Sequence, residues 1–217
     1  MRQLRITSLV LSSFLLLSGC AISKYKRLFC DKIIITTQDV APVIPASGLV
    51  KYKASIDVLK NHLSGLLLVK ETDSLTKRLV FVTELGLKMF DFEARNGTIN
   101  TVYVFDPLNK PVMIDALKRN FNHMLLLDAY WREAGKCAQK DRQIFALRSD
   151  PDKRYLSVAD TASRALSLQE TFHNHKLESR IEYSYDKHTE RYTKIKAKQY
   201  GLVKFYFDLE LIPPSHD

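Results

Sequence analysis

The sequence predicts a mainly β, α+β fold: a strongly curved antiparallel sheet, or partial barrel, with one amphipathic helix covering its concave face. From residue 48 onward, short runs rich in Val, Leu, Phe, Tyr and Thr follow one another, which is typical of strands. Their connections span only a few residues, as in antiparallel hairpins. One segment, residues 109–128, has clear helical spacing. Roughly ten strands in one sheet tend to curl, and a helix on the concave face would then enclose an apolar volume.

The start of the chain has the layout of a secretion leader. Arg2 and Arg5 precede an apolar run over residues 6–17, which is shorter than the roughly 20 residues needed to cross a bilayer core. Small residues close the run, as at a signal-peptide cleavage site. The sequence LSGC at residues 17–20 resembles the bacterial lipobox, in which the cysteine is diacylated and the chain is cut before it. We therefore expect lipidation of Cys20; an ordinary signal peptide with a chance cysteine is the alternative.

Lipidation would divide the chain into a signal peptide (1–19), a lipidated N-terminus with a linker (20–47) and a single half-barrel domain (48–217). About two acyl chains, such as palmitate, hold a protein durably to a membrane. The basic residues Lys24, Lys26 and Arg27 would then lie near anionic headgroups. The residue after the cysteine is Ala21 and not aspartate, which resembles the sorting pattern of outer-membrane lipoproteins. We expect a lipoprotein of the bacterial outer membrane that faces the periplasm.

Composition limits the classes of function. Without residues 1–19 the chain would keep 198 residues, enough for one domain with a sizeable core. The full chain has a net charge of +9, which suits acidic surfaces such as phospholipid. Nucleic acid is not expected as a partner, because an exported chain would rarely meet it. Cys30 and Cys137 could pair in an oxidising periplasm, but their spacing leaves the pairing open.

The elements follow from local patterns, beginning with residues 21–47. This segment reads as a linker with at most one short strand around 33–37, because Pro42 and Pro45 discourage regular structure. Residues 160–175 are ambiguous between a short helix and a loop. In the last strand, apolar and polar residues alternate with a period of two, which predicts one buried and one wet face. Strands are expected at 48–56, 62–71, 76–84, 87–94, 98–105, 143–148, 154–159, 178–186, 191–199 and 202–212.

The helix is expected to begin near Asn109, as a cap, and Pro111, in the first turn. A stripe of this kind is usually packed on a core; the sharper alternative is a lid over a lipid-sized cavity, where flexible methionines suit variable shapes. The apolar residues that recur on one helical face are Met113, Leu117, Phe121, Met124 and Leu125.

From Leu63 to Leu127 the sequence resembles the LolA/LolB lipoprotein-carrier superfamily. The stretch LSGLLLVKETDSLTKRLVFVTELGLKMFDFEARNG contains a strand starting with Ser64-Gly65, a Leu85-Gly86 turn and an apolar strand, and the amphipathic helix follows. The lipobox and the final strand GLVKFYFDLELI agree with that layout. The resemblance implies an unclosed antiparallel β-barrel with helices over its mouth, no catalytic residues, and binding of an acyl chain. LolB-like chains usually have helical sequence early, whereas residues 21–47 here look like a linker.

An acyl chain would enter a preformed cavity, driven by burial of apolar area. The bland alternative is an ordinary sheet core without a cavity. The residues that we expect on the concave, ligand-facing side are Leu79, Phe81, Phe90, Phe92, Leu117, Phe121, Phe205 and Phe207.

Other chemistries find little support. His173 and His175 could share a face, but zinc needs three or four ligands and no Cys or carboxylate cluster completes them in the sequence. A G-x-S-x-G elbow, a P-loop and a G-x-G-x-x-G fingerprint do not occur, so we expect no cofactor, no metal and no enzyme. The remaining histidines are scattered: His62, His123, His188 and His216.

Three lysines at a spacing of two form a basic stripe: Lys194, Lys196 and Lys198. Their spacing puts them on one face of a strand. The ordinary interpretation is a solvated face, and the functional one is a stripe that meets lipid headgroups, joined by Lys204.

The leading hypothesis is therefore a lipid-anchored carrier or acceptor that binds acyl chains in the localisation of lipoproteins or lipids to the outer membrane. The alternative is a non-catalytic structural or assembly lipoprotein of an envelope complex, which would bind envelope proteins through exposed edges and the basic stripe. A hydrolase comes third; it would need a convergent polar site with a perturbed pKa.

Overall fold

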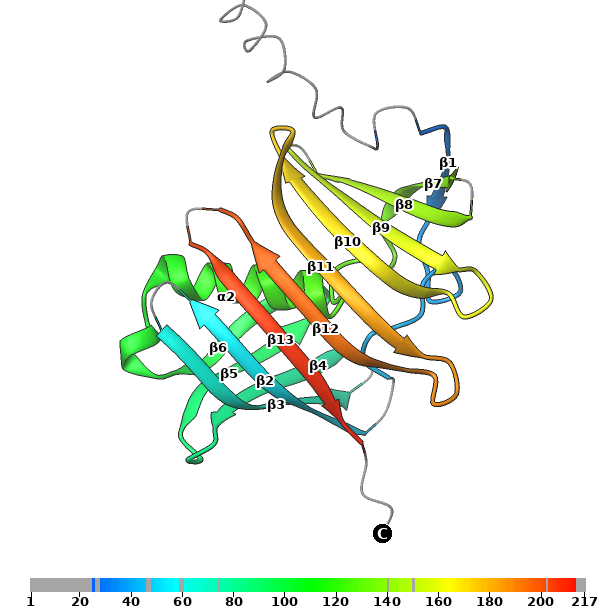
Figure 1. Cartoon of the computed structure of the whole chain (residues 1–217). Helices are drawn as coiled ribbons and strands as arrows, with labels where there is room; N and C mark the ends of the chain where they lie inside the picture. The colour runs from blue at the N-terminus through cyan, green and yellow to red at the C-terminus, as the bar shows by residue number, and fades with distance from the viewer. Residues whose placement is uncertain are drawn as a thin grey trace, which may run out of the picture.

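The computed structural model describes residues 25, 28–45, 48–58, 61–73, 75–139, 141–149, 151–201 and 203–213. Its main feature is one curved sheet of 13 strands (Figure 1). The order is β1-β7-β8-β9-β10-β11-β12-β13-β2-β3-β4-β5-β6, and all neighbours are antiparallel. β1 and β6 form the two ends, so the sheet does not close. The predicted mainly β fold, an unclosed antiparallel barrel with one helix, is confirmed.

Consecutive hairpins build most of this sheet. The hairpins are interrupted where β13 pairs with β2, which is far from it in the sequence, in the register Leu209–Ala54. β1 (Cys30–Ile34) pairs with β7 at the other end. The remaining strands are β2 (Leu49–Val58), β3 (Asn61–Asp73), β4 (Thr76–Thr83), β5 (Lys88–Arg95), β6 (Thr98–Val104), β7 (Glu133–Gln139), β8 (Arg142–Ser149), β9 (Asp152–Asp160), β10 (Ala165–His173), β11 (Lys176–Asp186), β12 (Arg191–Gln199) and β13 (Phe205–Ile212).

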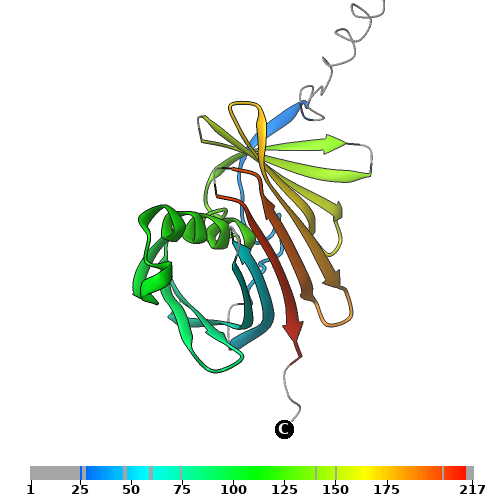
Figure 2. The same cartoon turned by 60° about the vertical axis from the view of Figure 1, so that its left-hand side comes forward.

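The helix α2 (Pro111–Met124) follows the short 3-10 helix η1 (Asp106–Leu108). Figure 2 shows α2 lying across the open side of the curve formed by β2–β6. Pro111 starts the helix as expected, but the N-cap residue is Lys110, and no side chain caps the helix. The buried face consists of Met113, Ala116, Leu117, Asn120, Phe121 and Met124. Among the described residues, no helix has the length and apolar character needed to span a membrane.

Two strands were not expected from the sequence. β7 reads EAGKCAQ, with little apolar character, yet it has a pairing partner on each side, β1 and β8. β10 lies in residues 160–175, for which the sequence leaves a short helix and a loop open, and the structure shows neither but a strand. Its register shifts next to Leu166 and at Thr171, and Gln169, Glu170 and Thr171 are buried polar residues. Local pattern therefore misses β7, which pairs with the distant strand β1, and β10, which contains bulges and buried polar residues.

Residues 36–45 form a segment that we call the strap, and it corrects the expected linker. Val40, Val43 and Ile44 are buried in the main core, and so is Ile35 just before them. The Ala41 N–H donates to the Arg164 carbonyl oxygen at 2.8 Å. The prolines prevent regular structure as expected, but the apolar residues between them pack beneath the sheet, so the described part of residues 20–47 belongs to the fold.

The N-terminal edge of the sheet is tied down by two further contacts. A disulfide joins Cys30 to Cys137 and links β1 to β7, which answers the question that spacing left open. Tyr25 stacks on Tyr155 with ring centroids 3.9 Å apart, and its hydroxyl donates to Glu170 Oε2 at 2.7 Å. These contacts hold β1 and Tyr25 on the sheet, and Tyr25 lies five residues along the chain from the expected lipid anchor.

Candidate ligand-binding site

The eight residues expected to face a cavity do lie together. All of them are buried in the main core between the sheet and α2. Phe121 of α2 packs against Phe90 at 5.3 Å and against Phe207 at 5.6 Å between ring centroids. Phe90 also stacks on Phe81 and Phe92. These rings fill the concave side of the sheet with one another, and their contact with a ligand stays a prediction.

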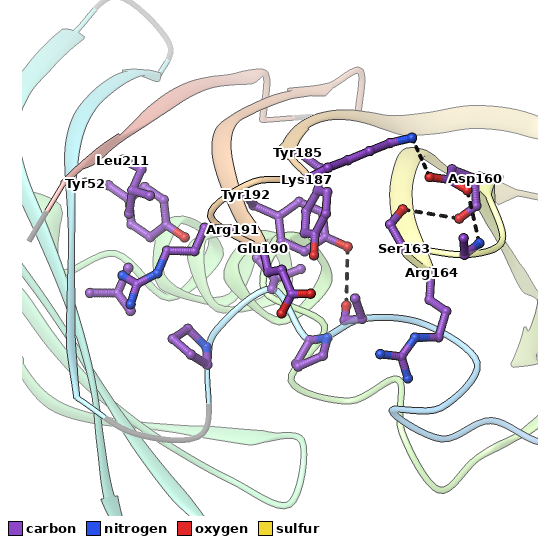
Figure 3. Close-up of a pocket in the computed structure, with 16 residues that line it drawn as sticks. Tyr52, Asp160, Ser163, Arg164, Tyr185, Lys187, Glu190, Arg191, Tyr192 and Leu211 are labelled. Carbon is purple, nitrogen blue, oxygen red and sulfur yellow. Dashed lines mark hydrogen bonds and ion pairs between the residues drawn. The ribbon is translucent and has the colours of Figure 1, made fainter.

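An open pocket lies instead where the strap crosses the ends of the strands. We call it the strap pocket, and its volume is about 450 Å³. Figure 3 shows its walls coming from the strap, the β9–β10 turn, the β11–β12 hairpin, and the adjoining ends of β2 and β13. None of the eight predicted cavity residues lines it. The pocket therefore reaches the core from a side that the sequence pattern did not indicate.

One wall of the strap pocket is apolar and continues into the core. Val43 of the strap and Val50 of β2 are almost fully buried, and Leu211 of β13 packs against them from the partly exposed side. Tyr52 is buried in the same wall, and this burial raises the pKa of its phenol well above the ordinary value. An apolar chain that entered the pocket would meet the main core without crossing a polar layer.

The strap is held over this wall by polar contacts with the sheet. The Tyr192 hydroxyl donates to the Ala41 carbonyl oxygen at 3.3 Å and accepts from the Leu166 N–H at 2.9 Å. The Arg164 guanidinium donates to the Thr37 carbonyl oxygen at 3.3 Å. A few hydrogen bonds of this kind stabilise the strap modestly, each by about 1 kcal/mol. Burial of Val40, Val43 and Ile44 in the main core adds to the stability of the strap.

The rim of the strap pocket is charged. Lys187 Nζ lies 2.7 Å from Asp160 Oδ2, so these two charges pair. Arg164, Arg191 and Glu190 also line the rim, and among the described residues none of the three forms an ion pair. Figure 3 shows Arg191 beside Tyr52 and Leu211, Arg164 on the opposite side near Ser163, and Glu190 between them. The rim thus offers both signs of charge next to an apolar wall.

A second pocket lies near the other end of the strands, beside the start of α2. Its volume is about 630 Å³, and its lining includes Val112 and Ala116 of α2, Leu177 of β11, and Val203. Beneath the helix, the Asn120 side-chain amide donates to Gln199 of β12 and to the Ala116 carbonyl oxygen. We call this second pocket the helix pocket.

The basic stripe lies on the outer face of the sheet, as its spacing predicted. Lys194 and Lys196 both face Asp208 of β13, at 3.5 and 3.8 Å. Lys198 lies over the Tyr200 ring, 5.2 Å from its centroid. Because one carboxylate sits between two of the lysines, the stripe is less positive than the sequence suggests. Contact with lipid headgroups stays a prediction.

A cluster of possible metal ligands surrounds His173, which the sequence left without carboxylate neighbours. Asp152, His173 and Glu178 place ligand atoms within 4.8 Å of one another. His173 Nδ1 lies 2.7 Å from Asp152 Oδ1, and Arg119 lies 3.5 Å from Glu178. These groups already pair with one another and with the guanidinium, so we interpret them as a surface ion-pair network.

Cys20, the expected lipidation site, lies outside the described residues, as do Lys24, Lys26 and Arg27. Sequence analysis missed the residues of the strap pocket because they come from five segments of the chain. A partial signal was present: the strap sequence QDVAPVIP alternates apolar residues with prolines, which favours a packed irregular segment over a solvated linker.

Comparison with known proteins identifies the class of fold. A crystal structure of a LolA superfamily protein from Nitrosomonas europaea matches with a TM-score of 0.53 and 10% sequence identity. The match covers 81% of this chain and 89% of that protein. No protein family model and no curated protein sequence matches the chain. At this level of identity the likeness shows the fold, and the chain has a LolA-like fold.

Proposed function

We propose that the chain is a lipid-anchored protein of the bacterial outer membrane that faces the periplasm and binds acyl chains as a carrier or acceptor of lipoproteins or lipids. The observation that carries this proposal is a LolA-like sheet whose apolar interior reaches the surface at the strap pocket. Small-molecule pockets commonly have about 300–1,000 Å³, so the strap pocket suits one segment of an acyl chain. The apolar wall formed by Val43, Val50 and Leu211 gives that chain a path toward the core.

Burial of apolar area would supply the driving force, at about 25 cal/mol per Å². The core beneath α2 is filled, so a longer chain would have to displace side chains or the strap. Met113 and Met124 on the buried face of α2 can change rotamer readily, which suits such a displacement. Displacement costs free energy, and this cost keeps binding moderate, as a protein that must pass its ligand onward requires.

The anchoring part of the proposal rests on the lipobox resemblance and on Tyr25. Cys20 precedes Tyr25 by five residues, and an extended chain of that length reaches at most about 18 Å. Tyr25 lies against Tyr155 and Phe172, on the strands β9 and β10. A lipidated Cys20 would therefore keep the outer face of these strands close to the membrane.

We also propose that the chain binds and does not catalyse. Two histidines have carboxylate partners: His62 lies 2.6 Å from Asp57, and His173 lies 2.7 Å from Asp152. Both pairs are exposed. His62 lines neither the strap pocket nor the helix pocket, and His173 lies at the rim of the helix pocket. Exposed pairs of this kind are better explained as solvated surface residues than as a general base and its partner.

The test is lipid extraction and native mass spectrometry on the mature chain purified from a bacterial envelope. We expect co-purifying acyl ligand in the wild type and its loss in Leu211→Asp, which places a charge in the apolar wall. Ile212→Asp is the matched control, because Ile212 is the next, equally half-buried residue of β13 and faces the other side. A folded wild-type chain without acyl ligand would contradict the proposal.

The alternative function, a structural lipoprotein of an envelope complex, is favoured by one feature. β6 is the end strand of the sheet and exposes Val102 and Tyr103, so its free edge could accept a strand of a partner. A ligand-free chain that retains envelope proteins, and releases them when Val102 is changed to Lys, would support this alternative.

A further inference from the structure

We propose that the rim of the strap pocket is a binding site for a zwitterionic phosphoester head group, one that carries a phosphate and an ammonium. The inference rests on the proposed function, because the same ligand would place its acyl chain along the apolar wall. It goes further by naming the chemistry at the polar end of the ligand and the residues that would select it.

The first support is the charge pattern of the rim. Lys187 and Asp160 neutralise each other at 2.7 Å and need no ligand. Among the described residues, Arg191 and Arg164 have no carboxylate partner and Glu190 has no cationic partner; Arg164 donates to the Thr37 carbonyl oxygen through one nitrogen of its guanidinium. Two guanidinium groups and one carboxylate are therefore available around one opening. A phosphate accepts hydrogen bonds from a guanidinium, and an ammonium donates to a carboxylate.

The second support is the position of these groups relative to the apolar wall. Arg191 extends beside Tyr52 and Leu211, and Glu190 lies between the two arginines (Figure 3). Arg191 is partly buried, and its charge acts on the buried Tyr52 phenol, opposing part of the rise in that pKa. A phosphate at Arg191 would thus sit directly where an acyl chain leaves the apolar wall.

The third support is the backbone. Glu190 has a φ of 52° and Arg164 a φ of 57°, a left-handed conformation in which glycine or asparagine is the usual residue. Both positions end tight turns, the β11–β12 turn and the β9–β10 turn. Five other described non-glycine residues also have a positive φ, so this conformation fixes where the two charged side chains start but does not by itself mark a binding site.

The test compares three single-chain lipids with the same acyl chain: lysophosphatidylethanolamine, lysophosphatidic acid and monoacylglycerol. Each is titrated below its micelle concentration into the full chain carrying Cys20→Ser, and heat is measured by calorimetry. We expect lysophosphatidylethanolamine to bind tightest, about tenfold more tightly than monoacylglycerol, which is the effect of one charge-assisted contact.

Variants assign this preference to residues. Arg191→Gln should reduce the affinity for lysophosphatidylethanolamine to that for monoacylglycerol. Glu190→Gln should remove the higher affinity for lysophosphatidylethanolamine than for lysophosphatidic acid. Arg148→Gln on β8 and Glu84→Gln in the β4–β5 turn are the matched controls, since both residues are exposed and lie away from the pocket; both should keep the wild-type order.

Equal affinity for all three lipids would overturn the head-group site and leave acyl binding intact. If Arg191→Gln kept the wild-type order of affinities, the head-group site would also be overturned and acyl binding would remain. Tighter binding of lysophosphatidic acid than of lysophosphatidylethanolamine would replace the zwitterionic site with an anionic one. Failure of every lipid to bind would instead overturn the proposed function itself.

Discussion

The two parts of this sheet differ in how much they depend on contacts between distant parts of the chain. The helix half, β2–β6 with α2, is made of neighbours along the chain, and its strands and helix lie where local pattern predicts them. The strap half, β1 and β7–β13 with the strap, is also built mostly of consecutive hairpins, but β1 and the strap are held to it by contacts across long sequence distances. The Cys30–Cys137 bond spans 107 residues, and the Ala41 N–H of the strap donates to the Arg164 carbonyl oxygen in the β9–β10 turn. The difference shows that the open, charged pocket lies where sequence periodicity is least informative.

The largest expected effect tests whether the helix half is packed or hollow. Phe121→Ala removes a fully buried ring that contacts Phe90, Phe92 and Phe207. We expect the free energy of unfolding to fall by about 4 kcal/mol, as for other buried aromatic truncations, measured by urea denaturation. Val112→Ala on the exposed face of α2 should change it by less than about 0.5 kcal/mol. A loss under about 1 kcal/mol in Phe121→Ala would indicate that the space beneath α2 is already open.

The next largest effect concerns the strap half. Replacing Cys30 and Cys137 with serine removes the covalent link between β1 and β7. We expect a loss of about 3 kcal/mol in unfolding free energy, measured under non-reducing conditions. Hydrogen exchange should accelerate first in β1 and β7, while β3 and β4 keep their protection. Uniform acceleration across both halves would show that the disulfide does not stabilise the strap half selectively.

A smaller effect is expected at the docked N-terminus. Tyr25→Phe removes the hydroxyl that donates to the buried Glu170 carboxylate and keeps the ring against Tyr155. We expect a loss of about 1 kcal/mol and faster proteolysis before residue 30, with no change in the helix half. Tyr103→Phe, on the exposed end strand β6, is the control and should leave both measurements unchanged. An unaltered Tyr25→Phe protein would mean that the hydroxyl contributes nothing and that ring packing and the disulfide hold the N-terminus.

The smallest effect is a pH dependence in the helix half. Arg78 donates to both carboxylate oxygens of Asp91, at 2.6 and 2.9 Å, and holds the pKa of Asp91 below its ordinary value. A carboxyl whose pKa is lower in the folded state stabilises that state at neutral pH, and the contribution disappears as pH falls below about 4. Asp91→Asn should therefore flatten the acid limb of a stability–pH curve. Asp31→Asn, exposed on β1, should leave that limb unchanged; a steeper limb in Asp91→Asn would refute the assignment.

Several features of the fold were within reach of the sequence. The alternation in residues 203–211 and the stripe from Met113 to Met124 predict which faces are buried. The apolar face of β13 and the apolar face of α2 both pack on the core. β10 is not recognised as a strand from the sequence, because Gln169 and Thr171 are polar and would be expected to face solvent, whereas the structure buries them. The strap pocket escapes prediction for a different reason. Arg191, Arg164 and Val43 come together only after the sheet has curved, and no spacing along the chain encodes that.

The measurement that tests the central claim most directly is photocrosslinking with an acyl chain that carries a diazirine near its end, followed by peptide mapping. If the chain enters the apolar interior through the strap pocket, labels will fall on Val43, Val50 and Leu211 and will disappear in Leu211→Asp. Labels on Val112, Leu177 and Val203 would place the entrance at the helix pocket. Labels spread over exposed residues of the outer face would contradict an acyl-binding interior altogether.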